Sequence, residues 1–536
     1  MKAKASAGAR KRTATLTLCL LLAVITINLV LPLLSLFGKA VDFTPFWAGF
    51  TKAVSSSTTK QALANSFAVT ACAATLSVVM AYFFAYIVEF KLKGKVKSAF
   101  RLISVLPMLV PSVTHGIVIV YLFGNMGLFT RLFGIHLNIY GPLGIIMGSF
   151  FYGFPMAFLV FSQAFVSLDG RLFDSARVLG VTPLRRFFDI TLPMTKYAAF
   201  SAFTVCFTMI FTDYGVPLSV GGTYPILPML FYKNVVGLLD FSSGAIYGVM
   251  LLAPAVVVYL LEVFWFGKKQ ASTKSTSLLE TGRFNLLQKL LFALITFAIG
   301  LCVLVILMVP FVSNWPYDLT LTTKYFALIT KNGKLLKLIV NSLTIALGTS
   351  FLGTLLTFFA GYLYVRDKNA SLPFKRLVHG LYTITLAIPG LALGLAFALF
   401  FKGTFLYNTL AILIIVNVMH FFGSPYMMSI SHFKLLDPNL EDICRSLGAS
   451  QLRTFTDVII PSSKKMLTDV FAYFFTNTMI TISAVSMLYN SRTMTMAVQI
   501  TAYNDQGAWE SAVSVSLVIL LINVAMKLWQ TRRLRN

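Results

Sequence analysis

The sequence predicts an all-α membrane protein with about 12 transmembrane helices, arranged as two parallel six-helix repeats. Its 536 residues are 57% hydrophobic and only 12% charged, a composition that does not fit a chain folded in water alone. Apolar stretches of about 20 residues recur along the chain, which is the length that crosses a bilayer as a helix, whereas a barrel would show shorter alternating segments. One polar segment occurs in each half, which indicates a duplication.

Twelve apolar stretches, each bounded by charged residues, glycine or proline, are the predicted spans. The first follows a basic head and resembles a secretory signal, but it is long and no small-residue cleavage site follows it, so we expect a retained anchor helix. The approximate ranges are 14–37, 62–90, 100–124, 141–166, 198–220, 243–266, 286–312, 338–365, 376–401, 406–431, 466–490 and 508–529.

The distribution of Lys and Arg sets the predicted orientation. With a cytoplasmic N-terminus, most of the 44 basic residues fall in segments on the cytoplasmic side, as the positive-inside rule requires. Both termini are therefore predicted to be cytoplasmic. The net charge of +26 follows this sidedness and does not indicate nucleic acid binding. The outside cluster that fits the rule least well is Lys324, Lys331, Lys334 and Lys337.

A polar, Ser/Thr-rich stretch between the sixth and seventh spans, Gly267 to Arg283, is typical of a flexible linker. The predicted organisation is a basic head (1–13), a first six-helix membrane domain (14–266), a cytoplasmic linker (267–285), a second six-helix membrane domain (286–530) and a tail (531–536). The five cysteines have no metal-ligand or disulfide spacing, so no metal site is predicted. They are Cys19, Cys72, Cys206, Cys302 and Cys444.

The repeated polar segment reads LDGRLFDSARVLGVTPLRRFFDITLP in its first copy, residues 168–193, and LDPNLEDICRSLGASQLRTFTDVIIP in its second, residues 436–461. The two copies align without a gap and are identical at 12 of 26 positions. We refer to them as the first and second elbows. Asn65-Ser66 and Asn341-Ser342 are a second repeated pair, and the two asparagines are expected to tie helices together.

Each elbow is predicted to be a helix, a tight turn and a second helix. In the first elbow the i, i+4, i+7 spacing of Leu172, Ala176 and Leu179 gives a short helix with one apolar stripe, and Gly180 follows where a left-handed residue ends a helix. Thr182 then begins another helix that runs to Pro193. The corresponding residues of the second elbow are Leu440, Cys444, Leu447, Gly448, Ser450 and Pro461.

An exposed apolar stripe flanked by charge and presented twice on one side of the membrane favours docking of two copies of a cytosolic partner. The alternative is an amphipathic segment that rests on lipid headgroups. The turn that both copies share favours docking.

These residues resemble the "EAA" coupling motif of ABC importer permeases. The first elbow has the acidic residue and alanine at Asp174 and Ala176, the glycine at Gly180 and the terminal Leu-Pro at Pro193. The second elbow is a degenerate version that keeps the acid, glycine and proline but lacks the alanines. Its matching residues are Asp442, Cys444, Gly448 and Pro461.

The resemblance implies a permease subunit of the bacterial plasma membrane whose elbows insert into two copies of a cytosolic ABC ATPase. It also implies an extracytoplasmic solute-binding protein that delivers a small solute. No G-x-x-x-x-G-K-[ST] phosphate loop occurs in the sequence, so ATP and Mg²⁺ are expected on the partner ATPase. This chain is therefore expected to be a transport subunit, not an enzyme, and to bind no cofactor.

Polar residues inside apolar spans are candidates for the solute pathway. Asp213 and Tyr214 lie in the fifth predicted helix, and Asn477 and Ser483 lie in the eleventh, around the matching position. Asp213 could bind an amine or cation, hydrogen-bond a neighbour, or mark the outer end of its helix. His115 and His420 are also candidates, although such residues are more often packed in a core.

Within the resembled family, the nearest groups are the permeases for 2-aminoethylphosphonate, ferric iron, thiamine and polyamines. The stretch from Ile190 to Gly237 is most similar to the aminoethylphosphonate group, so that zwitterion or a related phosphonate is the predicted solute. A different class, the ion-coupled secondary transporter, also has twelve helices in two parallel repeats, but it has no need of paired elbows. A membrane scaffold or sensor is the third alternative.

Overall fold

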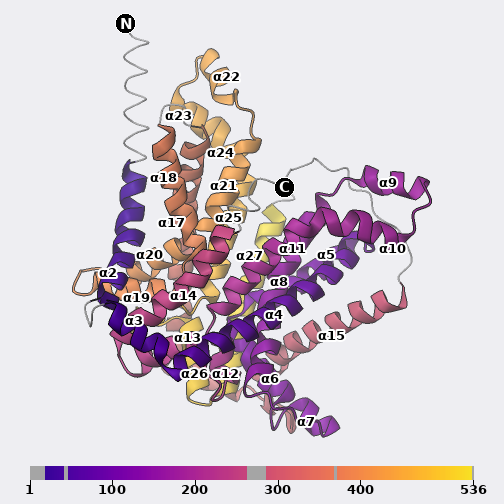
Figure 1. Ribbon diagram of the computed structural model, residues 1–536, viewed down its shortest axis with the longest axis vertical. Coiled ribbons are helices and arrows are strands. Elements are labelled where there is room, and N and C mark those ends of the chain that lie inside the picture. The colour runs from indigo at the N-terminus through magenta and orange to yellow at the C-terminus, as the bar shows by residue number, and fades with distance from the viewer. Residues whose placement is uncertain (1–18, 42–45, 262–284, 367–370, 534–536) are drawn as a thin grey trace.

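The computed structural model describes residues 19–41, 46–261, 285–366 and 371–533 (Figure 1). The predicted head (1–13) and nearly all of the predicted linker (267–285) lie outside these residues. The predicted tail overlaps the last described helix, which continues to Arg533.

The first half consists of helices joined by short turns. In chain order these are η1 (Thr26–Val30), α2 (Leu31–Val41), α3 (Phe46–Ser55), α4 (Ser57–Phe90), α5 (Gly94–Val105), η2 (Leu106–Leu109), α6 (Ser112–Phe123), α7 (Leu128–Phe133), α8 (Pro142–Val166), α9 (Gly170–Val178), α10 (Pro183–Arg186), η3 (Phe187–Thr191), α11 (Leu192–Phe211), α12 (Gly215–Val220), α13 (Leu227–Tyr232), η4 (Lys233–Gly237) and α14 (Phe241–Leu261).

The second half repeats this order and adds a two-stranded antiparallel hairpin. Its elements are α15 (Leu286–Met308), η6 (Val309–Phe311), β1 (Val312–Asn314), β2 (Asp318–Leu321), α16 (Lys324–Thr330), η7 (Lys331–Gly333), α17 (Lys334–Arg366), α18 (Leu372–Thr383), η8 (Ile384–Ala387), α19 (Gly390–Phe401), α20 (Leu410–Phe421), α21 (Gly423–Leu435), α22 (Leu440–Ser446), α23 (Gln451–Thr454), η9 (Phe455–Ile459), α24 (Ile460–Ser462), α25 (Lys464–Ile480), α26 (Met496–Asp505) and α27 (Trp509–Arg533).

The protein is an all-α membrane protein, as predicted. Within the part of the chain that is described, nine helices are long and apolar enough to cross a membrane, and two bent helix pairs raise that number to eleven. The remaining predicted span, 466–490, is represented by α25, which has only 17 residues. The prediction of twelve spans therefore exceeds the number of straight spanning helices.

Several predicted spans are broken, which corrects the sequence prediction. The predicted helix 100–124 is divided before Pro111, and the predicted helix 376–401 is divided before Pro389, where α18–η8 and α19 meet at 114°. Val110 and Ile388 are extended, with ψ angles of 155° and 117°, because the ring of a following proline excludes the helical conformation.

Breaks also occur in the fifth, tenth and eleventh predicted spans. Helix α11 ends at Phe211 and α12 begins only at Gly215, so the predicted helix 198–220 is not continuous. Helix α25 ends at Ile480, and 481–490 is not helical. In the tenth span, α20 and α21 meet at 56°. Loop backbone at membrane depth is tolerated where it is buried in protein or lines a cavity.

The two halves interlock through their first spanning helices (Figure 1). Helix α2 packs against α19 of the second half, and α15 packs against α4 and α6 of the first half. The main apolar core accordingly contains buried residues of both halves, such as Ile119 and Val515. Asn65 donates to Pro225 O at 2.9 Å and Asn341 donates to Arg492 O at 2.8 Å. Each asparagine therefore ties its long helix to the loop before the next short helix, α13 or α26, and not directly to another helix as predicted.

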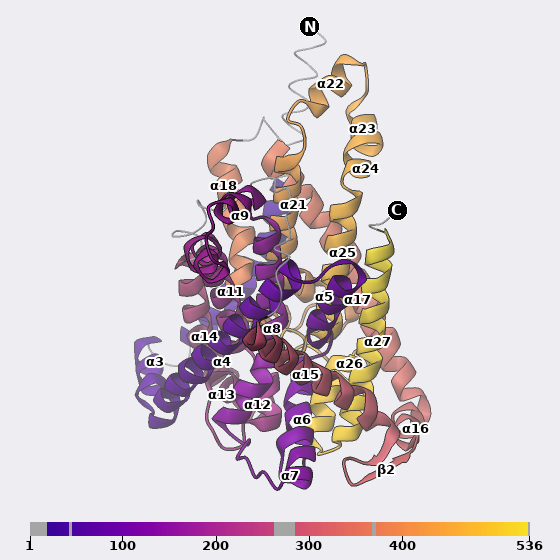
Figure 2. The same ribbon diagram turned by 90° about the vertical axis from the view of Figure 1, so that its right-hand side faces the viewer.

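The elbows lie at one end of the molecule (Figure 2). The short helices α9 and α10 and the short helices α22 and α23 project on the side where α27 ends, whereas α7, α16 and the β1–β2 hairpin lie on the opposite side. Both views separate α9 from α22, so the two elbows are distinct projections.

Candidate coupling surface and central cavity

The first elbow folds as the predicted helix, turn and helix. Gly180 has a φ angle of +69°, and the turn is closed by hydrogen bonds from Val181 N to Ala176 O (2.9 Å) and from Gly180 N to Arg177 O (3.0 Å). This pair of bonds is the Schellman motif, which satisfies the last carbonyl groups of a helix. The Thr182 hydroxyl then caps α10 by accepting from Arg185 N at 3.4 Å.

The second elbow repeats this geometry. Gly448 has a φ angle of +78°, and the hydrogen bonds from Ala449 N to Cys444 O and from Gly448 N to Arg445 O are both 3.0 Å long. The Ser450 hydroxyl accepts from Arg453 N at 3.2 Å. The turn therefore keeps its conformation although most of its surrounding side chains differ.

Ion pairs on the elbows are repeated as well. Asp174 and Arg177 approach to 3.4 Å, and their counterparts Asp442 and Arg445 approach to 3.1 Å. A second pair on each elbow joins Arg185 to Asp189 (3.1 Å) and Arg453 to Asp457 (3.5 Å). All four pairs are largely exposed and add little stability, but they give both elbows the same pattern of charge.

The apolar stripe predicted for the first elbow is divided between two sides. Ala176 is 7% exposed and faces the protein, whereas Leu172 is 46% and Leu179 is 79% exposed. Leu440 and Cys444 are half-buried, and Pro193 and Pro461 are exposed in the first turns of α11 and α24. We define the elbow face as the exposed apolar side chains Leu172, Val178, Leu179, Leu184, Phe188, Ile443, Leu447, Leu452 and Ile460.

An aromatic residue that sequence reasoning missed anchors each elbow to the membrane helices. Phe187 follows α10, Phe455 follows α23, and each packs among three aromatic rings of the preceding long helix. Phe187 lies 5.9, 6.4 and 5.6 Å from Tyr82, Phe83 and Tyr86 of α4. Phe455 lies 5.7, 5.6 and 5.2 Å from Phe358, Phe359 and Tyr362 of α17.

A cavity of ≈ 980 Å³ lies between the two halves. Its lining includes Leu435 and Lys465, which flank the second elbow, and it reaches the breaks after α11 and α25 at Asp213 and Thr481. The cavity thus extends from the elbow side of the molecule to the irregular backbone of the fifth and eleventh predicted spans.

Asp213, Asn477 and Ser483, which the sequence proposed for the pathway, all line this cavity. The Asp213 carboxylate accepts from the Ser112 hydroxyl at 2.6 Å and from Val216 N at 2.9 Å. It therefore holds a neighbouring hydroxyl and the start of α12 while it also faces the cavity.

Two of the three remaining candidates, Tyr214 and His115, are placed elsewhere. Tyr214 is 1% exposed and stacks on Tyr232 at 4.6 Å. His115 is fully buried beside Phe151, and its Nδ1 lies 4.0 Å from the Cys302 sulfur. Neither residue lines the cavity, whereas the third candidate, His420, does. The lining also includes four polar residues that the sequence analysis did not single out, namely Ser112, Tyr152, Gln163 and Tyr473.

The site offers hydroxyl, amide, imidazole and carboxylate groups, but no ready metal cage. Within the described residues there is no group of three or more His, Cys, Asp or Glu side chains that could hold a metal ion. The five cysteines are free thiols.

Two interlocked helical halves around a cavity lined in part by polar side chains, with paired helical projections on one side, are typical of transport permeases. Residues 77–267 and 353–535 match the family described as "Binding-protein-dependent transport system inner membrane component". The two matches cover more than half of the chain, so the protein belongs to this family of ABC importer permeases and carries two copies of its domain. The family confirms the predicted duplication, the multi-pass inner-membrane location and the assignment as a transport subunit, not an enzyme.

Curated relatives include the ferric transport system permease protein FbpB of Actinobacillus pleuropneumoniae, 23% identical over 80% of this chain and 65% of that protein. The putative ferric transport system permease protein FbpB 1 of Haemophilus influenzae is 24% identical over 73% of this chain and 65% of that protein. The chain thus spans just under two thirds of the length of these relatives. A crystal structure of a bacterial alginate ABC transporter matches with a TM-score of 0.42 and 16% identity, over 47% of this chain and 93% of that chain.

Proposed function

We propose that this chain is the membrane-spanning subunit of an ATP-driven importer and that its two elbows are the docking sites for two cytosolic ATPase subunits. The observation that carries the proposal is the duplicated elbow, with the same Schellman turn, the same ion pairs and an exposed apolar face in both copies. Several large apolar side chains exposed together on the aqueous side of a membrane protein indicate a protein partner.

The proposed mechanism is a rigid-body rocking of the two halves. ATP-driven closure of the ATPases would bring the elbows together, and the elbows would move α4 and α17 through Phe187 and Phe455. The cavity reaches the elbow side, which fits a state open to the cytoplasm. In this proposal the elbow side is cytoplasmic, both termini are cytoplasmic, and an extracytoplasmic solute-binding protein delivers solute at the opposite side.

Ferric iron is the first solute to test, because the relatives described above are named as ferric transport permeases. 2-Aminoethylphosphonate remains the second candidate, because its ammonium group would suit the Asp213 carboxylate in the cavity. A metal ion in transit needs no permanent cage, so the lack of one in the described part of the chain does not decide between the two.

Reconstitution of the chain with its co-purified ATPase in liposomes tests the proposed class. We expect uptake of ⁵⁵Fe(III) or radiolabelled 2-aminoethylphosphonate, delivered by the binding protein, only when ATP is present on the ATPase side. Uptake driven by an ion gradient without the ATPase would contradict the proposal and favour a secondary transporter. No flux under any condition would favour a scaffold or sensor.

A charged pair of substitutions tests the docking surface itself. Leu179→Glu combined with Leu447→Glu should abolish co-purification of the ATPase, because each carboxylate would have to be desolvated at the interface. Leu321→Glu is the matched control, since Leu321 is similarly exposed (82%) but belongs to β2, which lies on the opposite side of the molecule. Unchanged co-purification by the elbow variant would contradict docking at these faces.

A further inference from the structure

The two elbows are joined to the membrane helices by a second contact whose chemistry differs between the halves. The long helices α4 and α17 align when Ser66 is matched to Ser342, because these serines accept equivalent hydrogen bonds from Leu227 N (2.8 Å) and Met496 N (2.9 Å). The elbows align without a gap from their first residues onward. These two alignments define which residues of the two halves are equivalent.

In the first half this second contact is aromatic. Phe90 ends α4 and lies 5.6 Å from Phe173 of α9, ring centre to ring centre. Both side chains are nearly inaccessible, at 6% and 4% exposure. Such a contact is non-directional and insensitive to salt.

In the second half the same two positions form an ion pair. Arg366 ends α17 at the position that corresponds to Phe90, and Glu441 of α22 corresponds to Phe173. The Arg366 guanidinium donates to both Glu441 carboxylate oxygens, with Nε to Oε1 at 2.8 Å and Nη2 to Oε2. The arginine side chain is only 6% exposed and the glutamate 21%.

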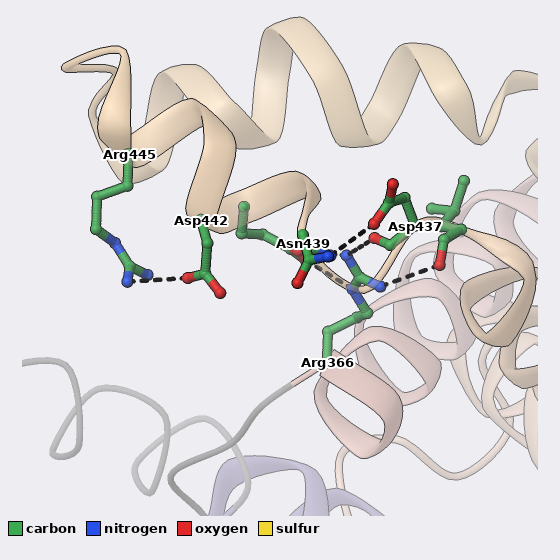
Figure 3. A network of polar contacts seen from close by, with 7 residues as sticks. Arg366, Asp437, Asn439, Asp442 and Arg445 are labelled. Atoms are coloured by element: carbon green, nitrogen blue, oxygen red, sulfur yellow. Dashed lines mark hydrogen bonds and ion pairs between the residues drawn. The ribbon is translucent and has the colours of Figure 1, made fainter.

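Arg366 also holds the chain that leads into the elbow (Figure 3). It donates to Leu436 O at 3.3 Å and to Asp437 O at 2.7 Å, just after α21 ends at Leu435. One guanidinium thus joins the ends of α17 and α21 to the start of α22. Asp442 and Arg445 pair with each other farther along α22.

We propose that Arg366 and Glu441 are positioning residues that form an ionic clamp, which ties the second elbow to α17 in the place where Phe90 and Phe173 tie the first elbow to α4. This inference rests on the proposed function, because a clamp matters only if the elbow is displaced by a partner. A bidentate guanidinium–carboxylate pair fixes orientation as well as distance. Loss of one partner leaves a half-buried charge unpaired, whereas replacement of both by apolar groups is tolerated.

The clamp predicts a distinctive pattern across variants. Arg366→Ala and Glu441→Ala should each loosen α22 from α17. The double variant Arg366→Phe with Glu441→Phe would rebuild the aromatic contact of the first half. It should restore the coupling between nucleotide binding at the ATPase and closure of the cavity. The charge exchange Arg366→Glu with Glu441→Arg should restore it in part. Lys324→Ala is the control, because Lys324 belongs to α16, which lies on the side opposite the elbows, and its hydrogen bond to Ser313 O (2.8 Å) is exposed.

The readout is closure of the cavity, measured in the chain bound to its ATPase with a Ser431→Cys reporter, since Ser431 lines the cavity. N-ethylmaleimide labelling of the reporter peptide is followed by mass spectrometry with and without ATP and vanadate. In the otherwise native chain and in the Lys324→Ala control, nucleotide should slow labelling roughly tenfold. In the two single alanine variants, it should slow labelling by less than about twofold. The Phe/Phe variant should recover most of the effect.

The labelling rates of the variants support or overturn the clamp as follows. A full nucleotide effect in both single variants would overturn the clamp. If the single variants do not assemble with the ATPase, recovery in the Phe/Phe variant supports the clamp and failure to recover overturns it. If the reporter shows no nucleotide effect in the otherwise native chain, the proposed function itself fails, which is distinguishable from failure of the clamp.

Discussion

Gly180 and Gly448 occupy the same position in the turns of the two elbows, with φ angles of +69° and +78°. Apart from the glycine and its two chain neighbours, no described residue has a heavy atom within 4 Å of the point where a β carbon would be placed at either position. The requirement for glycine is therefore conformational, because residues with a β carbon are strained in this left-handed region.

Gly180→Asp or Gly448→Asp should uncouple transport. The substitution strains the turn by about 1 kcal/mol and places a negative charge beside the elbow face, where docking would have to desolvate it. Co-purification of the ATPase and ATP-dependent uptake measure the effect. Gly180→Asn and Gly448→Asn are the matched controls, because asparagine has the same size without the charge and should retain most activity. Recovery of the ATPase by the Asp variants at full strength would count against this role.

Phe187→Ala and Phe455→Ala should detach the elbows from the long helices. Removal of a packed phenylalanine ring costs about 3 kcal/mol, so the elbow should open more often and become more susceptible to trypsin. Cleavage at Arg177 or Arg445, followed by mass spectrometry, measures this opening. Phe188→Ala is the control for the first elbow, since Phe188 is its neighbour but is 54% exposed. Equal cleavage rates for Phe187→Ala and Phe188→Ala would show that the contact of Phe187 with the aromatic rings of α4 does not hold the elbow in place.

Asp213→Asn should reduce uptake of the transported solute by roughly tenfold if the carboxylate contacts a cationic group in the cavity, because the charge attraction is lost at a site poorly screened by water. The amide keeps the size of the side chain, so assembly with the ATPase should persist. Asp469→Asn, the other carboxylate that lines the cavity, is the control near the cavity's elbow end. Native uptake by the Asp213→Asn variant would assign Asp213 a purely structural role through Ser112 and Val216.

The native thiol of Cys444 reports the orientation of the chain. It is partly exposed on the second elbow, so a membrane-impermeant maleimide should label it in inside-out vesicles and not in intact cells. Cys206 and Cys302 are buried and should stay unlabelled in both preparations. Labelling of Cys444 in intact cells would place the elbows outside and would contradict the predicted orientation.

Local patterns in the sequence were sufficient to predict the helix, turn and helix of each elbow. A glycine after an apolar repeat, followed by Thr182 or Ser450, predicts a left-handed turn and a helix cap, and both are present. The side of α9 that faces the protein was not predictable in the same way. Ala176 shares a periodic stripe with Leu172 and Leu179, but only the three-dimensional packing decides that Ala176 is buried.

Contacts between residues far apart in the chain could not be predicted from the sequence. Arg366 and Glu441 lie 75 residues apart. Phe187 contacts the three aromatic rings of α4 only because the fold brings the end of α10 next to α4. The prolines at 111 and 389 could have signalled the breaks in the third and ninth spans, because they restrict the residue before them. Similarly, Asp213 was recognised as a polar residue in an apolar span, but its bond to Ser112 depends on the fold.

A density map of this chain bound to its ATPase and the solute-binding protein tests the central claim most directly. The account predicts one ATPase subunit seated on each elbow, with Leu179 and Leu447 buried in the two contacts and the binding protein on the opposite side. Elbows that lie free in solvent or flat against lipid, with the ATPase bound elsewhere, would contradict it.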